Sequence, residues 1–331
     1  MSIFKVEVVK INTVISHPNA DRLDICTFEG MAYQVITAKG NFKPGDLAFY
    51  FPIDSVIPEQ YLDVFGIRPY YSKKLRAAKL RGIFSEGLLI PVGENFTGNV
   101  GDDYTEYFGV TKYEYPLPQS IKNGDMEAPI GHYKFPSPEN LKRYRDVLYP
   151  GEEVVVTEKL HGTNFTVFVD TEGTTRIGSH NYFWKNNETN KSLAYIRAYQ
   201  ENSALHKLPL NTQVFGEIYG VQDIKYGLQN GKIEIALFAV SRDSRFLNYT
   251  EFVEFCEEFS LPRVPVLYIG AYSWEAVSQF NNADSVISPD CMMEGVIVQS
   301  LVERTHPEIG RVVLKLISDR YLLRKDGTEL H

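Results

Sequence analysis

Cysteine is scarce in this chain of 331 residues, which holds only Cys26, Cys256 and Cys291. The three lie far apart, and no Cys-x-x-Cys pair or Cys/His cluster occurs, so neither a disulfide framework nor a structural zinc site is expected. No apolar run approaches the roughly 18 residues that cross a bilayer, and Lys5 and Glu7 interrupt the segment where a signal peptide is apolar. The sequence therefore predicts a cytoplasmic protein without a membrane partner.

Positive charge is also in the minority. Lys and Arg total 34 against 42 Asp and Glu, a net charge of −8, which argues against a protein that coats nucleic acid through overall charge. The window 68–82 differs, because it holds six cations and no acid. It is either a solvated face or a strip that contacts phosphates, and Tyr70 and Tyr71 within it suit single-stranded nucleic acid. The candidate contacts are Lys73, Lys74, Arg76, Lys79 and Arg81.

Runs of β-forming residues divide the chain into two parts. Up to about residue 100, runs such as KVEVVKI and LAFYFPI alternate with Pro and Gly turns, as in a small antiparallel barrel. Six prolines between 110 and 150 indicate a connector, in which a short helix is predicted from Pro138. Beyond it, strands mix with helices expected around 191–204, 250–259 and 273–283. The expected class is α+β, with an all-β barrel in 1–110, a linker in 111–135 and an antiparallel-sheet domain in 136–331.

Charged residues stand at the ends of apolar β-like runs in the second part. Lys159 ends EVVVTEKL and, taken alone, is best interpreted as a Lys at a sheet rim that reaches water. The pattern recurs, however, at Glu217, Phe238, Glu294 and Lys315. Two Lys and two Glu at buried strand ends predict one cavity of mixed charge, where nucleotide and metal chemistry is done. Because no GxxxxGK[ST] or GxGxxG occurs, phosphate would be held by cationic side chains and a metal ion.

Five segments in order resemble the motifs of the covalent nucleotidyltransferases, the superfamily of polynucleotide ligases and mRNA capping enzymes. They are EKLHGTN (158–164), FGEIYG (215–220), LFAV (237–240), MEGVIV (293–298) and LKLIS (314–318). The chain is most similar to ATP-dependent RNA ligases that carry an OB domain ahead of the catalytic domain. HPNADRL (17–23) resembles OB modules that bind tRNA, and KLRGIFSEGLLIP (79–91) is similar to a stretch of those ligases. The resemblance implies an RNA-binding OB-like barrel followed by an adenylyltransferase domain.

The resemblance implies that Lys159 attacks the α-phosphate of ATP, which gives a lysyl-AMP and pyrophosphate. AMP then passes to the 5′-phosphate of a polynucleotide, and a 3′-hydroxyl attacks that phosphate and expels AMP. Lys315 would contact the α-phosphate, while Glu217 would bind a ribose hydroxyl or a metal-bound water and Glu294 would help hold the metal. Lys159, Glu217, Glu294 and Lys315 are thus the implied catalytic residues, and ATP with Mg²⁺ or Mn²⁺ the implied cofactors.

The same motif match assigns residues to the nucleotide. Phe238 would stack on the adenine, Glu158 would help recognise it, and Gly162 would leave room for the backbone to approach the nucleotide. His161 stands where DNA ligases and capping enzymes have Asp, which suggests an imidazole near the pyrophosphate or the departing phosphate. Arg143 is a weaker candidate for phosphate contact.

Two further positions depart from the family pattern. Val313 stands where the last motif commonly has a second Lys, so Arg311 is a candidate substitute. The segment GSHNYFWK (178–185) lies where a basic residue is expected near the ribose, and Arg176, His180 and Lys185 are the alternatives.

The expected activity is ATP-dependent sealing of RNA 3′-hydroxyl and 5′-phosphate ends by a monomer, with RNA or an RNA-containing duplex with a nick as the partner. A DNA ligase or capping enzyme is disfavoured, because these usually place an OB domain after the last motif and few residues follow Lys315. A non-catalytic RNA-binding protein with a relic ligase domain is the alternative from another class. Retention of both Lys and both Glu argues against it, because burying charges in an idle pocket costs free energy.

Overall fold

The computed structural model describes residues 3–114, 125–127, 134–180 and 182–324. The chain forms two compact units, each built from segments that are separate in sequence. The first unit comprises residues 1–115, 139–146 and 319–331, and the second comprises 116–138 and 147–318. The segments 139–146 and 319–331 therefore group with the N-terminal part. No helix in the described ranges has the length and apolar character needed to cross a membrane.

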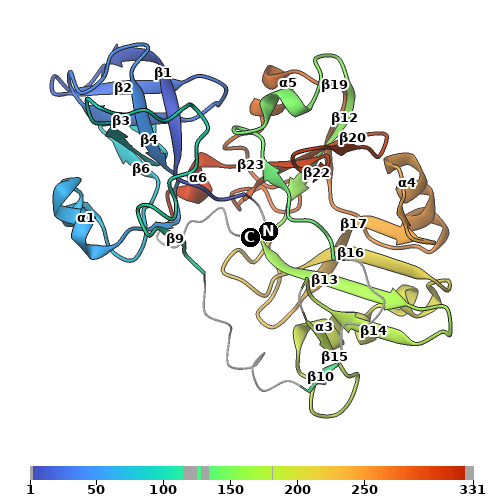
Figure 1. The fold of residues 1–331 in the computed structure, drawn as a ribbon. Helices are drawn as coiled ribbons and strands as arrows, with labels where there is room; N and C mark the ends of the chain where they lie inside the picture. The colour runs from blue at the N-terminus through green and yellow to red at the C-terminus, as the bar shows by residue number, and fades with distance from the viewer. Residues whose placement is uncertain (1–2, 115–124, 128–133, 181, 325–331) are drawn as a thin grey trace. The chain divides into compact units, whose positions relative to one another are not determined.

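A five-stranded antiparallel sheet with the order β3-β2-β1-β4-β8 forms the first unit (Figure 1). Its elements are β1 (Glu7–Ser16), β2 (Leu23–Phe28), β3 (Gln34–Ala38), β4 (Leu47–Phe51), β5 (Ser55–Val56), α1 (Glu59–Val64), the 3₁₀ turn η1 (Arg68–Tyr70), β6 (Ala78–Leu80), β7 (Ile83–Ser85), β8 (Leu88–Pro91), β9 (Thr111–Lys112), β11 (Glu139–Asn140) and α6 (Asp319–Leu322). The backbone N–H of Glu86 donates to the carbonyl of Gln34 at 3.0 Å, so the chain before β8 meets β3 and the barrel is nearly closed.

The first half of strand β1 is buried on both faces. Val9 and Ile11 belong to one cluster of buried residues, while Val6 and Val8 belong to another that includes Leu62 of α1. Because side chains alternate along a strand, successive valines serve opposite sides of the sheet. The barrel wall thus lies between two apolar layers.

The helix predicted from Pro138 is wrong. This segment forms β11, a turn and the 3₁₀ turn η2 (Arg145–Val147). The Asn140 side chain accepts a hydrogen bond from the Lys142 backbone N–H, and its carbonyl accepts from Arg143 and Tyr144. Tertiary contacts override the helical pattern, because the Lys142 and Arg143 side chains are both buried in ion pairs.

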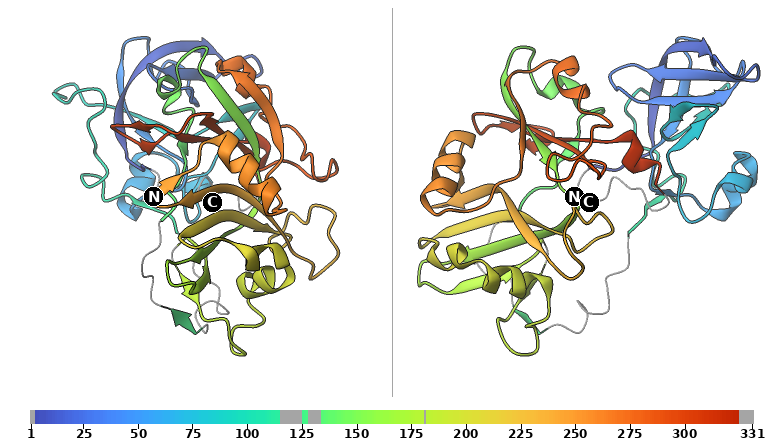
Figure 2. Two further views of the ribbon diagram at one scale, coloured as in Figure 1. Left: turned by 90° about the vertical axis from the view of Figure 1, so that its right-hand side faces the viewer. Right: turned by 180° about the vertical axis from the view of Figure 1, so that it is seen from behind.

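Two antiparallel sheets form the second unit, drawn as separate layers in Figures 1 and 2. One has the order β10-β15-β14-β13-β16-β17-β18, and the other contains β23-β20-β12-β19. The elements are β10 (Met126–Glu127), β12 (Glu153–Lys159), β13 (Gly162–Val169), β14 (Thr175–Gly178), β15 (Phe183–Trp184), α3 (Ala194–Glu201), η3 (Ser203–Lys207), β16 (Thr212–Tyr219), β17 (Glu234–Arg242), β18 (Arg245–Phe246), α4 (Tyr249–Glu258), β19 (Val266–Ala271), α5 (Trp274–Ser278), β20 (Gly295–Ser300), β21 (Thr305–His306), β22 (Gly310–Arg311) and β23 (Val313–Ile317).

Helices α3 and α4 pack on one face of the seven-stranded sheet. Their buried side chains join one core cluster with Phe165 of β13, Val214 and Ile218 of β16 and Leu237 of β17. Helix α4 begins at a capping box formed by Asn248 and Glu251. By alternation, the residues between these core positions point away from the helices, and Glu217 is among them.

Candidate active site

Lys159 is the last residue of β12 and pairs with Glu294, which directly precedes β20. The Lys159 Nζ lies 2.6 Å from Glu294 Oε1. The Glu294 side chain is 1% exposed and that of Lys159 12%, so a charge-assisted hydrogen bond forms almost out of water. The amine is therefore held in one place by the strand end and by its carboxylate partner.

Lys315 lies on the same face of this sheet as Lys159. Thr157 of β12 stands opposite Ile297 of β20, which in turn stands opposite Lys315 of β23. Cross-strand neighbours share a face, as do residues two apart along a strand, so this row lies on the Lys159 side. Lys315 is 3% exposed, and Ile297, on the strand between β12 and β23, is partly exposed. Lys159, Lys315 and the apolar Ile297 side chain thus share this face of the sheet.

Glu217 comes to this group from the other sheet. Burial raises the pKa of Glu217 to about 8, the negative charge of Glu294 adds to the rise, and Lys159 and the Gly162 backbone N–H oppose it. The charges of Lys159 and Glu294 thus act on Glu217, which lies beside Gly162: a Cβ at Gly162, three residues beyond Lys159, would lie 3.1 Å from Glu217 Cγ. The structure brings together the residues that the sequence placed at separate strand ends.

The two carboxylates suit a hydrated divalent cation. Glu294 raises the pKa of Glu217 by electrostatic repulsion, and a cation bound between the two carboxylates would relieve this repulsion. Within the described residues, no group of three His, Cys, Asp or Glu side chains is placed to hold a metal. Glu217 and Glu294 would thus supply two oxygen ligands and leave the rest to water and phosphate, as is usual for Mg²⁺.

His161 is buried beside these carboxyls. Its Nε2 lies 2.7 Å from Asp223 Oδ1 and its Nδ1 3.4 Å from Glu294 Oε2. Its backbone N–H donates to the Tyr226 hydroxyl at 2.6 Å. Sequence reasoning missed Asp223 and Tyr226, although the run VQDIKYG directly after FGEIYG could have indicated them.

Gly162 meets the neighbouring strand at very short range. A Cβ at this position would lie 2.1 Å from the Ile218 carbonyl oxygen of β16. The structure therefore gives this glycine a packing role between β13 and β16, which differs from the expected role of making room for a nucleotide.

Phe238 is the extra residue of a β-bulge. Phe215 pairs with Ala239 and Gly216 with Leu237, so Phe238 has no partner on β16. Its partly buried ring packs with Phe135 at a centroid distance of 5.0 Å, on the side away from the helices. The bulge redirects an aromatic ring toward the side of the sheet that carries Glu217.

Glu158 points to the opposite face of β12 from Lys159. Burial raises its pKa, while hydrogen bonds from Ser285 and from the Val286 backbone N–H, the latter 3.0 Å from Oε2, oppose the rise. Within the described residues, its buried Oε1 has no hydrogen-bond partner. Its role in adenine recognition stays a prediction, with this oxygen as the group that could accept from a base.

The weaker basic candidates form ion pairs elsewhere. Arg143 is buried in the first unit against Glu7, and Arg311 pairs with Glu303 and lies 4.1 Å from the Phe246 ring centroid. The other two pairs are Arg176 with Asp170 and Lys185 with Asp125. His180 lies in the turn between β14 and β15.

The basic strip is partly taken up by folding. Lys74 is 7% exposed and its Nζ lies 2.6 Å from Asp54 Oδ1, a buried ion pair that removes Lys74 from the strip. Arg68 forms ion pairs with Glu59 and Asp63, and the other cations of the strip are exposed: Lys73, Arg76, Lys79 and Arg81. The last two belong to the β6–β7 hairpin, whose turn is held by His17 at the Leu80 carbonyl (3.0 Å) and by Asn19 at the Arg81 carbonyl (3.0 Å). The two N-terminal segments that carry the OB resemblance are thus in contact.

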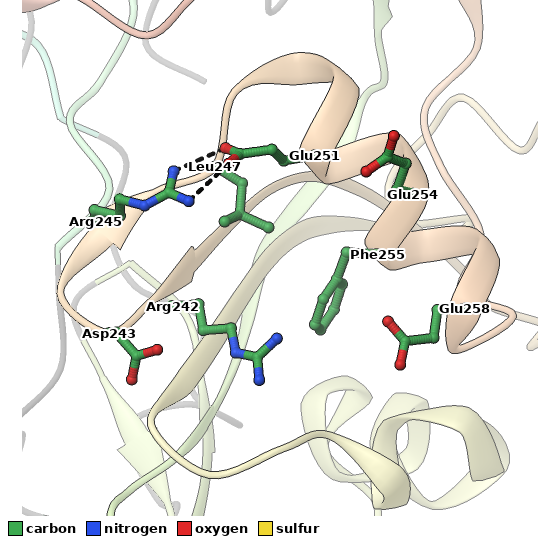
Figure 3. Close-up of a pocket in the computed structure, with 8 residues that line it drawn as sticks. All are labelled: Arg242, Asp243, Arg245, Leu247, Glu251, Glu254, Phe255 and Glu258. Atoms are coloured by element: carbon green, nitrogen blue, oxygen red, sulfur yellow. Dashed lines mark hydrogen bonds and ion pairs between the residues drawn. The ribbon is translucent and has the colours of Figure 1, made fainter.

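A separate pocket of about 350 Å³ lies beside α4 (Figure 3). Arg245 forms two hydrogen bonds of 2.7 Å with Glu251 across its rim. The pocket is lined by more acids than cations: Arg242, Asp243, Arg245, Leu247, Glu251, Glu254, Phe255 and Glu258. None of the predicted site residues lines it, and its excess of negative charge does not suit a triphosphate.

Comparison with known proteins identifies both parts of the chain. An RNA ligase family model matches residues 152–317, and an OB-fold domain model matches residues 5–92. An apo variant of Naegleria gruberi RNA ligase is 25% identical with a TM-score of 0.79, over 97% of this chain and 98% of that chain. The same enzyme with PPi is 24% identical with a TM-score of 0.78, over the same shares of both chains.

A third structure, a variant of the Naegleria gruberi enzyme with ATP and Mn, is 24% identical with a TM-score of 0.77, over 96% of this chain and 98% of that chain. No curated protein matches the chain. The expected OB barrel followed by a ligase domain is confirmed. The RNA ligase model spans half of the sequence and includes Lys159, Glu217, Phe238, Glu294 and Lys315. The chain therefore belongs to the RNA ligase family.

Proposed function

We propose that this RNA ligase joins 3′-hydroxyl and 5′-phosphate ends at nicks in RNA-containing duplexes, through a lysyl-AMP on Lys159 and an adenylylated 5′ end. The observation that carries the proposal is the convergence of Lys159, Glu217 and Glu294 from two sheets, with Lys315 on the Lys159 face. A surface Lys at a sheet rim would have no reason to meet two carboxyls drawn from separate strands.

The first step forms a bond between the neutral Lys159 Nζ and the α-phosphorus of ATP, breaks the bond from that phosphorus to the pyrophosphate oxygen, and passes the proton that the amine loses to the Glu294 carboxylate. Glu294 holds the amine at 2.6 Å, and Lys315 offers a buried positive charge to the α-phosphate. Displacement at phosphorus depends mainly on alignment and on neutralised charge, which are what fixed strand ends provide.

ATP and Mg²⁺ or Mn²⁺ are the proposed cofactors. Structures of the Naegleria gruberi enzyme contain ATP and Mn. Here Glu217 and Glu294 would hold the cation, which when bound neutralises phosphate charge and favours displacement. Phe238 would stack on the adenine, and Ile297, partly exposed on the facing sheet, supplies an apolar surface for the same base.

The exposed strip on the first unit is the proposed RNA contact. Lys73, Arg76, Lys79 and Arg81 present four cations, two of them on a hairpin whose turn is anchored by side chains. A backbone-tracking surface of this kind binds phosphates regardless of sequence and is sensitive to salt.

The test is transfer of AMP from α-labelled ATP with Mg²⁺. We expect the full chain to take label, Lys159→Ala to take none, and Lys191→Ala, which changes an exposed Lys, to label normally. Labelling of Lys159→Ala would refute the nucleophile assignment. Sealing is then measured on nicked duplexes with every RNA/DNA combination at the break. Tight RNA binding without labelling or sealing would favour a non-catalytic RNA-binding protein instead.

A further inference from the structure

The segment between β16 and β17 braces the turn that follows β12. Gln222 Nε2 donates to the Gly162 carbonyl at 3.3 Å, and the Tyr226 hydroxyl accepts the His161 backbone N–H at 2.6 Å. Asp223 Oδ1 lies 2.7 Å from the His161 ring. Three side chains of one short segment therefore reach the same two residues.

Tyr226 shows that this segment is shaped for the contact. Its φ is +50°, in the left-handed region that residues other than glycine rarely adopt. The side chain is buried, and its hydroxyl satisfies a backbone N–H that would otherwise lie without water. The backbone thus adopts an unusual conformation at the residue whose phenol reaches the turn after Lys159.

The contacts continue from this segment to the Lys159 amine through a line of four side chains. Asp223 meets His161 at 2.7 Å, His161 meets Glu294 at 3.4 Å, and Glu294 meets the Lys159 amine at 2.6 Å. The inner two side chains are 3% and 1% exposed, whereas that of Asp223 is 70% exposed. A surface carboxylate thus begins a line that ends at the reacting nitrogen.

An imidazole has two nitrogens, so a partner on one of them fixes where the other points. With Nε2 held by Asp223, the His161 ring places Nδ1 3.4 Å from Glu294 Oε2, where an imidazole protonated on both nitrogens forms an ion pair with the carboxylate. Without that partner the ring can turn, and its Nδ1 then leaves its place beside the Glu294 oxygen that Lys159 does not use.

We propose that Asp223 is a positioning residue for the adenylylation step, which acts by fixing the His161 ring so that Glu294 stays on the Lys159 amine. The inference rests on the proposed function and adds to it a residue outside all five motifs. It requires the rate of AMP transfer to depend on Asp223 more than ATP affinity does, because Asp223 acts on the Lys159 amine through His161 and Glu294.

The experiment compares Asp223→Ala, Asp223→Asn and the control Glu172→Ala, an exposed acid in the β13–β14 turn. AMP transfer to the full chain is followed against ATP concentration. We expect Asp223→Ala to lower the rate at saturating ATP by roughly 10–100-fold with KM within about threefold of the parent. Asp223→Asn keeps the acceptor oxygen and should recover most of the rate. The melting temperature should not change, since the side chain is exposed.

Sealing of a nicked duplex whose 5′ end is already adenylylated gives the second readout. The Lys159 amine is not the nucleophile there, so we expect Asp223→Ala to lose much less in this reaction than in AMP transfer. Equal loss in both reactions, a raised KM with an unchanged rate, or AMP transfer equal to Glu172→Ala would each overturn the inference alone. A parent protein that takes no label from ATP would overturn the proposed function and this inference together.

Discussion

A methyl group at Gly162 should destabilise the second unit and disable the site together. In Gly162→Ala the new Cβ would lie 2.1 Å from the Ile218 carbonyl oxygen, 2.8 Å from its carbon and 3.1 Å from Glu217 Cγ. The obstructing atoms are mostly backbone, so β13 and β16 must move apart. Overpacking costs typically about 1–3 kcal/mol, and a backbone obstacle places this substitution near the upper end, at about 3 kcal/mol.

The assay is thermal unfolding combined with AMP transfer. For a unit of this size each kcal/mol lowers the melting temperature by roughly 2–4 °C, so we expect a fall of about 6–12 °C. AMP transfer should fall as well, because the displaced strand carries Glu217. Gly93→Ala is the control, since its Cβ would meet nothing within 4 Å and its φ is not left-handed.

A specific result would refute this reasoning. If Gly162 serves only to let the nucleotide approach, Gly162→Ala keeps the parent melting temperature and raises only the KM for ATP. Parent-like stability would therefore show that the strand contact is not what requires glycine here.

Three further outcomes follow from other residues. With a metal chelator present, Glu217→Gln should be more stable than the parent, by a margin that grows from about pH 4.5 to 8 and reaches a few kcal/mol in denaturant unfolding. The reason is that the folded-state pKa of Glu217 is raised to about 8, so the parent loses stability as pH rises through this window. Equal dependence of the free energy of unfolding on pH in both proteins would contradict this. Lys74→Met should cost about 3–5 kcal/mol because Asp54 is left buried without its cation, and a loss below about 1 kcal/mol would contradict the ion pair. Replacing Lys73, Arg76 and Lys79 with Ala should flatten the salt dependence of sealing by about 0.9 in slope for each phosphate that is no longer bound and leave AMP transfer intact, whereas an equal fall in both activities would indicate a folding role.

The strands that carry the motif residues could be predicted from the pattern of apolar runs, whereas the chemical roles of these residues stay predictions. Lys159 and Lys315 end or interrupt apolar runs, and a charge in such a run has few reasons to be there. That both lie on one face depends on the pairing and register of β12, β20 and β23, which only the structure shows. The antiparallel architecture could be predicted because short β-like runs alternate with Pro and Gly turns.

Partners could not be predicted, because sequence shows the type of a residue and not what it meets. Lys74 sits among exposed cations in sequence but is buried against Asp54, which is twenty positions away. The segment from Pro138 has helical spacing, yet its two basic side chains are used in buried ion pairs. Asp223 has the composition of an ordinary loop residue, and only the fold reveals its contact with His161.

The barrel of the first unit depends on residues that are synthesised long after its strands. Glu86 is buried in the first unit, and its cation, Lys142, is also bonded to Asp319 at 3.3 Å. A nascent chain that ends near residue 115 would hold Glu86 without this counter-ion, and the trio is complete only after the whole catalytic sequence has been made. The first unit is therefore completed only after the second has been synthesised. A truncated protein that contains only the N-terminal strands should have a lower free energy of unfolding than the same strands have in the full chain.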